Sequence, residues 1–327
     1  MAGHFEHIAA SGITWCTTGL RLTIPSTVRD VHQDGRAGID AALVRRLIAT
    51  QFPQWRDQPV TPVAIDGWDN RTYRLGTQLS VRLPTAASYA SAVEKEDRWL
   101  PILAPSLPVA VPVPLATGRP GGGYPFCWSV RPWLDGRTAL EQPPVDLGDF
   151  AISIAEFLLA LQRIDATDGP IAGAHSFYRG ASPKYYDNET RECLRALRGR
   201  IDIDAAATVW DAALATTWSR APVWFHGDVA SGNLLVRDGR LTAVIDFGTC
   251  GVGDPACDLV VAWTFFHGQS RDMFRNRVQQ DTDTWARARG WVLWKALISL
   301  GGDADEAAWE LNVPIIEEVI ADHDRFG

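Results

Sequence analysis

The pattern of apolar and polar positions predicts strands in the first half of the chain. Five short extended runs, separated by Gly, Pro and Asp turn signals, are typical of antiparallel strands. They are residues 60–65, 72–75, 79–83, 113–117 and 126–133. Helical periodicity predicts one helix that starts at Asp40, a candidate N-cap, and a second that ends at Leu103. The three glycines at 121–123 predict a hairpin turn, because no helix follows them as a phosphate-binding loop would require.

The second half of the chain follows the helical period. Apolar residues recur on one face of a helix at Phe150, Ile154, Phe157, Leu158 and Leu161. Strand-like runs return only within residues 222–247. The pattern therefore predicts the α+β class, with a small N-terminal lobe built on an antiparallel sheet and a larger, mostly helical C-terminal lobe.

Three segments follow from these patterns. Residues 39–133 are expected to form the N-terminal lobe, and residues 134–327 the C-terminal lobe. Residues 1–38 lack sustained periodicity and are rich in Thr, Gly and Ser, so we expect an N-terminal extension that is a candidate for disorder. The composition, 46% hydrophobic and 21% charged, is that of a chain that folds around a core.

Cysteine usage and hydropathy favour a cytoplasmic protein. The five cysteines form no C-x-x-C pair, and their odd number argues against a complete disulfide framework. The first residues lack the apolar run of a secretion signal, and no stretch reaches the ~18 apolar residues of a membrane span. We therefore expect no membrane partner.

The charge balance bears on the ligand. The chain has 39 acidic and 31 basic residues, for a formal net charge of −8. This balance disfavours nucleic acid as a partner and suits cationic ligands. Only Lys95, Lys184 and Lys295 are lysines, so a site that needs a lysine has few candidates.

Residues 223–248 combine the groups that phosphoryl transfer requires. An apolar run leads into His226-Gly-Asp228, Asn233 follows five positions after Asp228, and two further runs end in Asp246-Phe-Gly. We expect the flanking strands to bring Asp228, Asn233 and Asp246 to the same ends of neighbouring strands.

These three side chains suggest a division of roles. One carboxylate can orient an attacking hydroxyl and accept its proton, while an amide and a second carboxylate hold magnesium on the nucleotide phosphates. We therefore take Asp228 as the base and Asn233 and Asp246 as the metal ligands. The alternative is that all three are ordinary turn and cap residues, and their joint occurrence favours the catalytic interpretation.

The motifs resemble those of the aminoglycoside phosphotransferase family. The resemblance extends from residue 39 to the end of the chain and rests on three motifs. They are His226-Gly-Asp228 with Asn233, Ile-Asp246-Phe-Gly, and Gly-Asp254-Pro-Ala-Cys-Asp258-Leu. The resemblance implies a bilobal protein-kinase-like fold, ATP or GTP as phosphate donor, Mg as cofactor, and an aminoglycoside-type antibiotic as acceptor. It also implies that His226 packs rather than catalyses. Asp254 and Asp258 are expected to cap and anchor the following helix, because acids at a helix start meet its positive end.

The N-terminal lobe departs from the kinase pattern at one position. Kinase-like folds place a lysine on the third strand to hold the nucleotide phosphates, paired with a helix glutamate. Arg82 stands at that position here. Glu94 and Glu96 are both candidates for the pair, and the family pattern favours Glu96. Arginine can grip a phosphate with its planar fork, so phosphate binding is still expected.

Two further segments are candidates for nucleotide contacts. The hairpin that contains Asn70 and Arg71 is expected to cover the phosphates, or to be a plain turn. Residues 131–134 resemble the hinge between kinase lobes, so Arg131 and Trp133 are candidates for the base-binding region, or for core between the lobes.

The acceptor is less well defined by the sequence. Acidic residues of the C-terminal lobe are candidates for attracting a cationic acceptor: Asp281, Asp283, Glu306, Glu310, Glu317 and Glu318. A kinase for another alcohol, such as a macrolide, choline, a sugar or a metabolite, is an alternative, because the motifs identify the reaction and not the acceptor. A catalytically silent nucleotide-binding protein is a second alternative, suggested by Arg82. A monomer and a homodimer are both compatible with the sequence.

Overall fold

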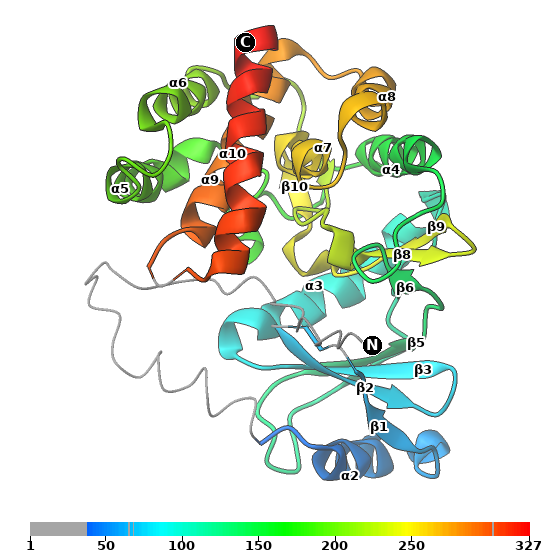
Figure 1. Ribbon diagram of the computed structural model, residues 1–327. Helices are drawn as coiled ribbons and strands as arrows, with labels where there is room; N and C mark the ends of the chain where they lie inside the picture. The colour runs from blue at the N-terminus through cyan, green and yellow to red at the C-terminus, as the bar shows by residue number, and fades with distance from the viewer. Residues whose placement is uncertain (1–37, 65, 68, 303) are drawn as a thin grey trace, which may run out of the picture.

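The computed structural model describes residues 38–64, 66–67, 69–302 and 304–327 (Figure 1). The expected N-terminal extension, residues 1–38, lies outside the described residues except for Gly38.

The N-terminal part is built on one antiparallel sheet of five strands in the order β1-β2-β3-β5-β4. The strands are β1 (Val60–Pro62), β2 (Asn70–Leu75), β3 (Leu79–Pro84), β4 (Ala116–Gly118) and β5 (Trp128–Pro132). Two helices and two short 3-10 turns accompany them: α2 (Ala41–Gln51), α3 (Ala87–Leu103), η1 (Pro53–Trp55) and η2 (Ala104–Ser106). Figure 1 shows α2 at the outer side of the sheet and α3 between the sheet and the helical part.

Local signals in this part act as predicted. The Asp40 carboxylate accepts the Leu43 N–H at 2.7 Å and caps α2. The hairpin at Gly121 is closed by two backbone hydrogen bonds of 2.9 Å with Tyr124, and Gly122 and Gly123 between them have positive φ. Such backbone angles are those that glycine adopts without strain.

The C-terminal part is mostly helical. Its helices are α4 (Leu147–Gln162), α5 (Asp187–Ala196), α6 (Ile203–Leu214), α7 (Val261–Thr264), α8 (Gly268–Val278), α9 (Thr282–Ser299) and α10 (Glu306–Phe326). Helix α9 contacts α5, α6 and α10 and is buried on most of its circumference. Its burial makes it the central helix of this part, so side chains on α9 have fixed surroundings.

Short strands and 3-10 turns connect these helices and carry the sequence motifs. They are β6 (Arg137–Thr138), β7 (Val223–Phe225), β8 (Leu234–Arg237), β9 (Arg240–Val244), β10 (Gly251–Gly253), η3 (Ala174–Ser176), η4 (Pro183–Tyr186), η5 (Ser231–Asn233), η6 (Phe247–Thr249) and η7 (Pro255–Val260). The prediction of neighbouring strands is correct for β8 and β9 but wrong for β7, which pairs with β10 in a separate two-stranded sheet. The Gly251–Gly253 run that follows the Asp246 motif supplies this partner.

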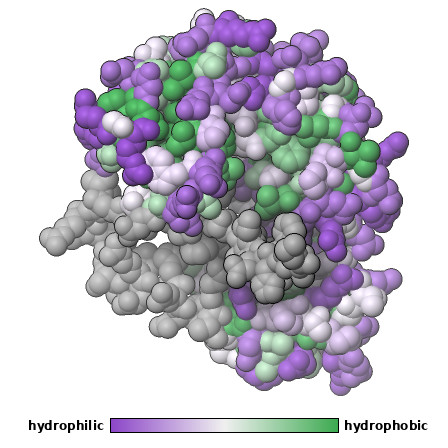
Figure 2. All heavy atoms as spheres, viewed as in Figure 1, coloured by the Kyte–Doolittle hydropathy of each residue, from purple (hydrophilic) through white to green (hydrophobic). Residues whose placement is uncertain are grey.

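The architecture confirms the predicted α+β class with its two unequal parts. A smaller apolar core joins α2 to the sheet, and a larger one fills the helical part and includes the end of α3. Polar side chains predominate on the face in Figure 2, where apolar groups form small patches. Within the described residues, no helix combines the length and apolar character needed to cross a bilayer.

Candidate active site

The loop between β7 and β8 depends on a glycine for its shape. Gly227 has a φ of 87°, and a Cβ added there would lie 2.8 Å from Thr249 Oγ1 and 3.0 Å from the Thr249 carbonyl oxygen. The Thr249 hydroxyl donates to the His226 carbonyl at 2.9 Å, which holds the two segments together. Both the backbone angle and the close approach exclude a side chain, so the arginine that protein kinases carry here cannot be accommodated.

Asp258 holds the same loop through its backbone. Its two carboxylate oxygens accept the N–H groups of His226 at 2.8 Å and Gly227 at 2.7 Å, and the side chain is fully buried. Burial raises the pKa of Asp258 to about 6. The predicted helix-capping role therefore belongs to Asp254 alone, whose carboxylate accepts the Ala256 N–H at 3.1 Å.

His226 is a packing residue, as predicted. Its Nδ1 accepts the Asp228 N–H at 3.2 Å, and its Nε2 lies 3.0 Å from the Ile245 carbonyl oxygen. The ring meets the Phe247 ring edge-on at 4.5 Å and is fully buried. Both ring nitrogens are thus used to position the backbone beside Asp228 and ahead of Asp246.

Asp228 lies between an amide and an ammonium group. Asn233 Nδ2 donates to the Asp228 carbonyl at 2.9 Å and to Asp228 Oδ2 at 3.1 Å. Lys295 Nζ, from α9, donates to Asp228 Oδ1 at 3.1 Å. Burial would raise the pKa of Asp228, but Lys295 and Arg179 outweigh it and lower the pKa to about 2. Asp228 is therefore an oriented carboxylate at neutral pH.

Asp246 follows β9 in a left-handed conformation, with φ 67° and ψ 64°. The Ile245 N–H donates to the Asn233 carbonyl at 2.9 Å, so Asn233 and Asp246 lie at the same end of the β8–β9 pair. Because the amide nitrogen of Asn233 faces Asp228, its amide oxygen is left as an acceptor. An amide oxygen and a carboxylate are the hard donors that Mg²⁺ prefers.

The donor set fits magnesium better than a transition metal. Within the described ranges, no three His, Cys, Asp or Glu side chains converge as a metal cluster. Mg²⁺ is commonly held by one or two protein groups, with substrate phosphates and water completing the shell. Asn233 and Asp246 are suited to such a site.

Arg82 links the N-terminal sheet to Asp246. Its Nη2 donates to Asp246 Oδ1 at 3.0 Å, and its Nη1 lies 3.7 Å from Glu96 Oε1 on α3. Glu94, the other candidate partner, is exposed. The sheet, α3 and the Asp246 motif therefore meet at one guanidinium group.

Arg131 lies behind this contact instead of at a nucleotide-facing surface. It is 1% exposed, and its guanidinium donates to Glu96 Oε2 at 2.6 Å, to Ser129 Oγ at 2.9 Å and to the Pro112 carbonyl at 3.4 Å. Burial would raise the pKa of Glu96, but Arg131 and Arg82 outweigh it and lower the pKa. Arg131 thus keeps Glu96 ionised and in place for Arg82.

The remaining nucleotide-contact candidates lie farther along the sheet. Asn70 begins β2, and Arg71 pairs with Asp66 at 2.8 Å. The Trp133 ring lies under the Arg74 guanidinium, 3.9 Å from ring centroid to Cζ, and the Trp133 backbone N–H donates to the Gln78 carbonyl at 2.7 Å. Within the described residues, the hydrogen bonds and ion pairs of Asn70, Arg71 and Trp133 do not reach the loop that carries Asp228.

Sequence reasoning missed Asp69 in the same hairpin. Its carbonyl oxygen accepts the N–H of Thr85 at 2.9 Å and the Thr85 hydroxyl at 3.1 Å, which ties the hairpin to the end of β3. Burial and the Asp246 carboxylate raise the pKa of Asp69 to about 7. The hairpin therefore brings a carboxyl group into the electrostatic range of Asp246.

The acidic residues predicted to attract a cationic acceptor lie elsewhere on the C-terminal part. All six are exposed, and none lines the cavity beside Asp228. Asp281 caps α9 and pairs with Arg220, and Glu318 pairs with Arg271 at 2.7 Å.

Two cations that sequence reasoning missed lie beside Asp228 instead. A cavity of about 20 Å³ there is lined by the Asp228 loop and by Arg179, Cys257, Val260, Trp291, Trp294 and Lys295. The scarcity of lysine was the one available signal, because Lys295 is one of only three. Nothing in the local sequence marks Arg179.

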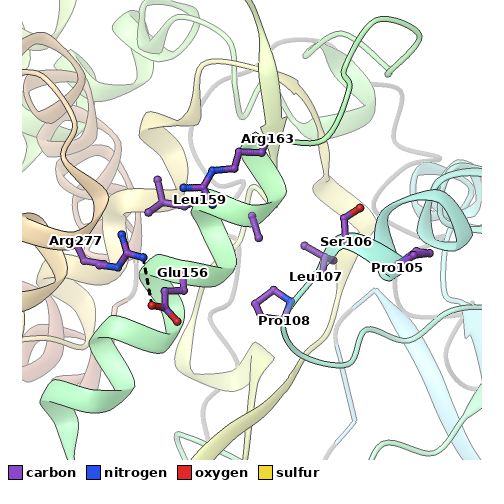
Figure 3. A pocket seen from close by; sticks show the side chains of 9 residues that line it. Pro105, Ser106, Leu107, Pro108, Glu156, Leu159, Arg163 and Arg277 are labelled. Atoms are coloured by element: carbon purple, nitrogen blue, oxygen red, sulfur yellow. Dashed lines mark hydrogen bonds and ion pairs between the residues drawn. The ribbon is translucent and has the colours of Figure 1, made fainter.

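A larger cavity of about 310 Å³ lies away from this site (Figure 3). It is an open pocket bordered by the proline-containing segment after α3 and by α4, with the Glu156–Arg277 ion pair of 3.3 Å at one side. None of the predicted site residues lines it.

The fold and the site together define a phosphotransferase with a kinase-like fold. The sequence matches the model of the phosphotransferase enzyme family over residues 60–291, and the chain belongs to that family. This match confirms the resemblance carried by the motifs. No curated protein sequence matches the chain.

Solved structures share the fold at low sequence identity. The GDP complex of a mutant aminoglycoside 2′-phosphotransferase-IIIa is 20% identical, with a TM-score of 0.65 over 87% of this chain and 99% of that one. The ADP-bound aminoglycoside phosphotransferase APH(2″)-Ib is 17% identical, with a TM-score of 0.55 over 86% and 97%. The macrolide 2′-phosphotransferase MphH from Brachybacterium faecium is 22% identical, with a TM-score of 0.56 over 85% and 97%.

Proposed function

We propose that this protein transfers the γ-phosphate of ATP or GTP to a hydroxyl group of a small molecule. One observation carries the proposal: Asp228, Asn233 and Asp246 meet beside β8 and β9, and Arg82 of the N-terminal sheet lies 3.0 Å from Asp246. This arrangement offers a base, two metal donors and a phosphate-binding cation within one region. Membership of the phosphotransferase family supports it.

In this mechanism Asp228 orients the acceptor hydroxyl and takes its proton. The hydroxyl oxygen forms a bond to the γ-phosphorus, the bond from that phosphorus to the bridging oxygen breaks, and ADP or GDP leaves. With a pKa of about 2, Asp228 is a weak base. This suits a loose transition state, in which positioning contributes more than early proton removal. Magnesium, bound by Asn233 and Asp246, would neutralise charge on the phosphates.

Side chains of the N-terminal sheet would bind the nucleotide. Arg82 is proposed to contact the phosphates, with Glu96 fixing its position and Arg131 fixing Glu96. Asn70 and Arg71 are proposed to lie over the phosphates. Trp133 is proposed to border the base, at the point where the sheet ends.

The choice of nucleotide and acceptor rests on the similar proteins. Solved neighbours hold GDP or ADP, which supports both donors for this chain. Their names include aminoglycoside and macrolide phosphotransferases, so an antibiotic of either class is a candidate acceptor, and an aminoglycoside is the one that the family resemblance implies.

An assay of nucleoside diphosphate release tests this proposal. The full chain is incubated with magnesium and ATP or GTP across aminoglycosides, macrolides and small alcohols, including hydroxy acids. Release stimulated by an acceptor, and lost in Asp246→Asn or without magnesium, is the expected result. Nucleotide binding without release above the Asp246→Asn background for every acceptor and for water would instead indicate a silent nucleotide-binding protein.

A further inference from the structure

A row of aromatic rings leads from the cavity beside Asp228 to the surface. Trp294 lines the cavity, and the Tyr186 ring stacks on the Trp294 ring with centroids 4.2 Å apart. The Tyr185 ring meets that of Tyr186 edge-on at 5.2 Å and stacks on the ring of Tyr178. Contact between rings is therefore continuous from the Asp228 cavity to Tyr178 and Tyr185.

The outer end of this row is exposed. Tyr185 is 56% exposed and Phe177 is 37% exposed, whereas Tyr178 and Tyr186 are half-buried. The Phe177 ring centroid lies 6.3 Å from that of Tyr89 on α3, so the aromatic surface extends to the N-terminal part. Large apolar side chains that are exposed together mark binding sites on soluble proteins. We call Phe177, Tyr178 and Tyr185 the aromatic platform.

Two members of the platform have an unfavourable backbone conformation. Phe177 and Tyr178 are consecutive residues with φ of 48° and 56°, in the left-handed region that bulky side chains rarely adopt. Two hydrogen bonds of 2.8 Å hold the turn: the Tyr178 N–H donates to the Gly173 carbonyl, and the Tyr186 hydroxyl donates to the Phe177 carbonyl. Backbone strain of this kind gathers at ligand-binding sites. Glycine or asparagine would relieve the strain, yet both positions carry an aromatic ring.

The cations beside the platform do not call for an anionic ligand. Arg179 is 5% exposed, and both Asp69 and Asp228 lie within its electrostatic range. Lys295 is paired with Asp228 at 3.1 Å. Lys184 is exposed and forms no ion pair in the described part of the chain. A cationic ligand would therefore meet an unpaired ammonium group next to the platform, which is unfavourable.

The acids on the neighbouring helix α5 are already engaged. Asp187 accepts the Trp210 indole N–H at 2.8 Å and pairs with Arg191 at 2.8 Å. Glu189 accepts the Trp294 indole N–H at 2.8 Å. The platform therefore offers a ligand ring faces instead of charge.

We propose that the acceptor carries an uncharged ring, which stacks on the aromatic platform while its hydroxyl reaches Asp228. The inference rests on the proposed function, which makes the Asp228 side the acceptor side. The cavity of about 20 Å³ has room for one hydroxyl group, so the rest of the acceptor must lie outside it. An aromatic ring and the C–H face of a sugar ring both offer the flat apolar surface that stacks on aromatic side chains.

A titration that needs no phosphoryl transfer tests the platform. The chain has six tyrosines, so protein carrying ring-labelled tyrosine gives six sets of NMR signals. Tyr178→Phe, Tyr185→Phe and Tyr186→Phe assign the signals of the row. The full chain is titrated with benzyl alcohol and with methyl glucoside, which distinguish an aromatic ring from a sugar ring. Ethylene glycol is the alcohol without a ring, and tetramethylammonium is the cation without a ring.

A saturable shift of the Tyr178 and Tyr185 signals with benzyl alcohol or methyl glucoside is expected, and none with ethylene glycol or tetramethylammonium. Tyr185→Ala should raise the dissociation constant, followed at Tyr178, about threefold to tenfold, as expected for the loss of one stacked ring. Tyr185→Phe keeps the ring and should bind nearly as tightly as the unchanged protein. Phe326→Ala is the matched control, because Phe326 is 42% exposed at the end of α10, outside the row, and it should leave binding unchanged.

Three results would overturn the inference. The first is the absence of a saturable shift with both ring compounds. The second is a shift of the Tyr185 signal with tetramethylammonium as large as with either ring compound, which would make the platform a cation site. The third is a Tyr185 signal that a soluble nitroxide does not broaden without ligand, which would show that another part of the protein covers the ring.

The two assays separate this inference from the proposed function. Diphosphate release without a ring-dependent shift would reject the ring site and leave the phosphotransferase in place. A positive titration with a silent diphosphate-release assay would instead reject the proposed function and leave the ring site in place.

Discussion

Two carboxylates in this protein each face two cations, yet their surroundings differ. Glu96 lies between Arg82 and Arg131, and its side chain is 4% exposed. Asp228 lies beside Lys295 and Arg179, and its side chain is 31% exposed at the edge of a cavity. Both are kept ionised by their cations, as the lowered pKa of each shows.

The difference in solvent exposure between the two carboxylates separates a structural role from a chemical one. The Glu96 carboxylate is closed off from solvent, so its role is to hold Arg131 and Arg82, and through Arg82 it joins the sheet and α3 to Asp246. The Asp228 carboxylate lies at the edge of a cavity and is partly exposed, so it is available to a ligand. Two carboxylates with similar ion pairs therefore have different roles, and the burial of each carboxylate decides its role.

The largest expected effect comes from a substitution of Asp228. Asp228→Asn should lower turnover by roughly 10²- to 10⁴-fold, because the carboxylate that orients the acceptor hydroxyl and takes its proton is lost. Its free energy of unfolding should change by no more than about 1 kcal/mol, as expected for a partly exposed ion pair. Steady-state kinetics and denaturant unfolding of the same preparation measure both. Unchanged turnover would remove Asp228 from the proposed role.

A substitution of Glu96 should instead have its main effect on the free energy of unfolding. Glu96→Gln leaves Arg131 buried without its carboxylate, and breaking such a pair costs about 3–5 kcal/mol of unfolding free energy. Glu94→Gln is the matched control, since Glu94 is exposed two positions away on α3. Chemical denaturation is the measurement. Equal stability of the two variants would show that Glu96 is not a structural centre.

Arg82→Lys tests the connection between the Glu96 cluster and Asp246. Lysine restores the residue usual in kinase-like folds, but a single ammonium cannot reach Asp246 and Glu96 as the guanidinium fork does. We expect nucleotide affinity in the presence of magnesium to fall by about tenfold. Calorimetric titration with ADP and GDP measures this. Tighter binding would mean that the fork geometry is not what the site uses.

A carboxylate that has no cation partner in the described part of the chain sets the lower end of the scale. Asp40 caps α2 with one hydrogen bond to the Leu43 N–H. Asp40→Ala should lower the free energy of unfolding by about 1 kcal/mol. Asp40→Asn, which can still cap the helix, should lose much less. A loss as large as that of Glu96→Gln would contradict the ranking by burial and charge.

Sequence reasoning was most informative where the groups lie close together in the chain. Asp228, Asn233 and Asp246 fall within one short segment, and the strands between them leave few ways to arrange it. The exception is β7, because strand runs alone do not reveal that Gly251–Gly253 is its partner. The three predicted chemical roles stay predictions until activity is measured.

Contacts between distant segments had no local signal. Lys295 meets Asp228 across 67 positions, and α9 is buried on most sides, so no amphipathic pattern shows which face points to the loop. Arg131 sits on a strand whose two faces are both covered, so alternation could not separate a buried ion pair from a surface residue. The net negative charge of the sequence likewise does not show where positive side chains lie together in the structure.

The geometry at Gly227 also constrains how this sequence can change. Arginine at position 227 would need its backbone to leave a left-handed conformation, and the new Cβ would still lie 3.0 Å from the Thr249 carbonyl after the Thr249 side chain was removed. No single substitution, and no pair confined to these two side chains, relieves both obstacles. Replacing the glycine loop of this protein by the arginine loop of protein kinases therefore requires a backbone rearrangement. A single substitution that converts one sequence into the other is unfavourable for that reason.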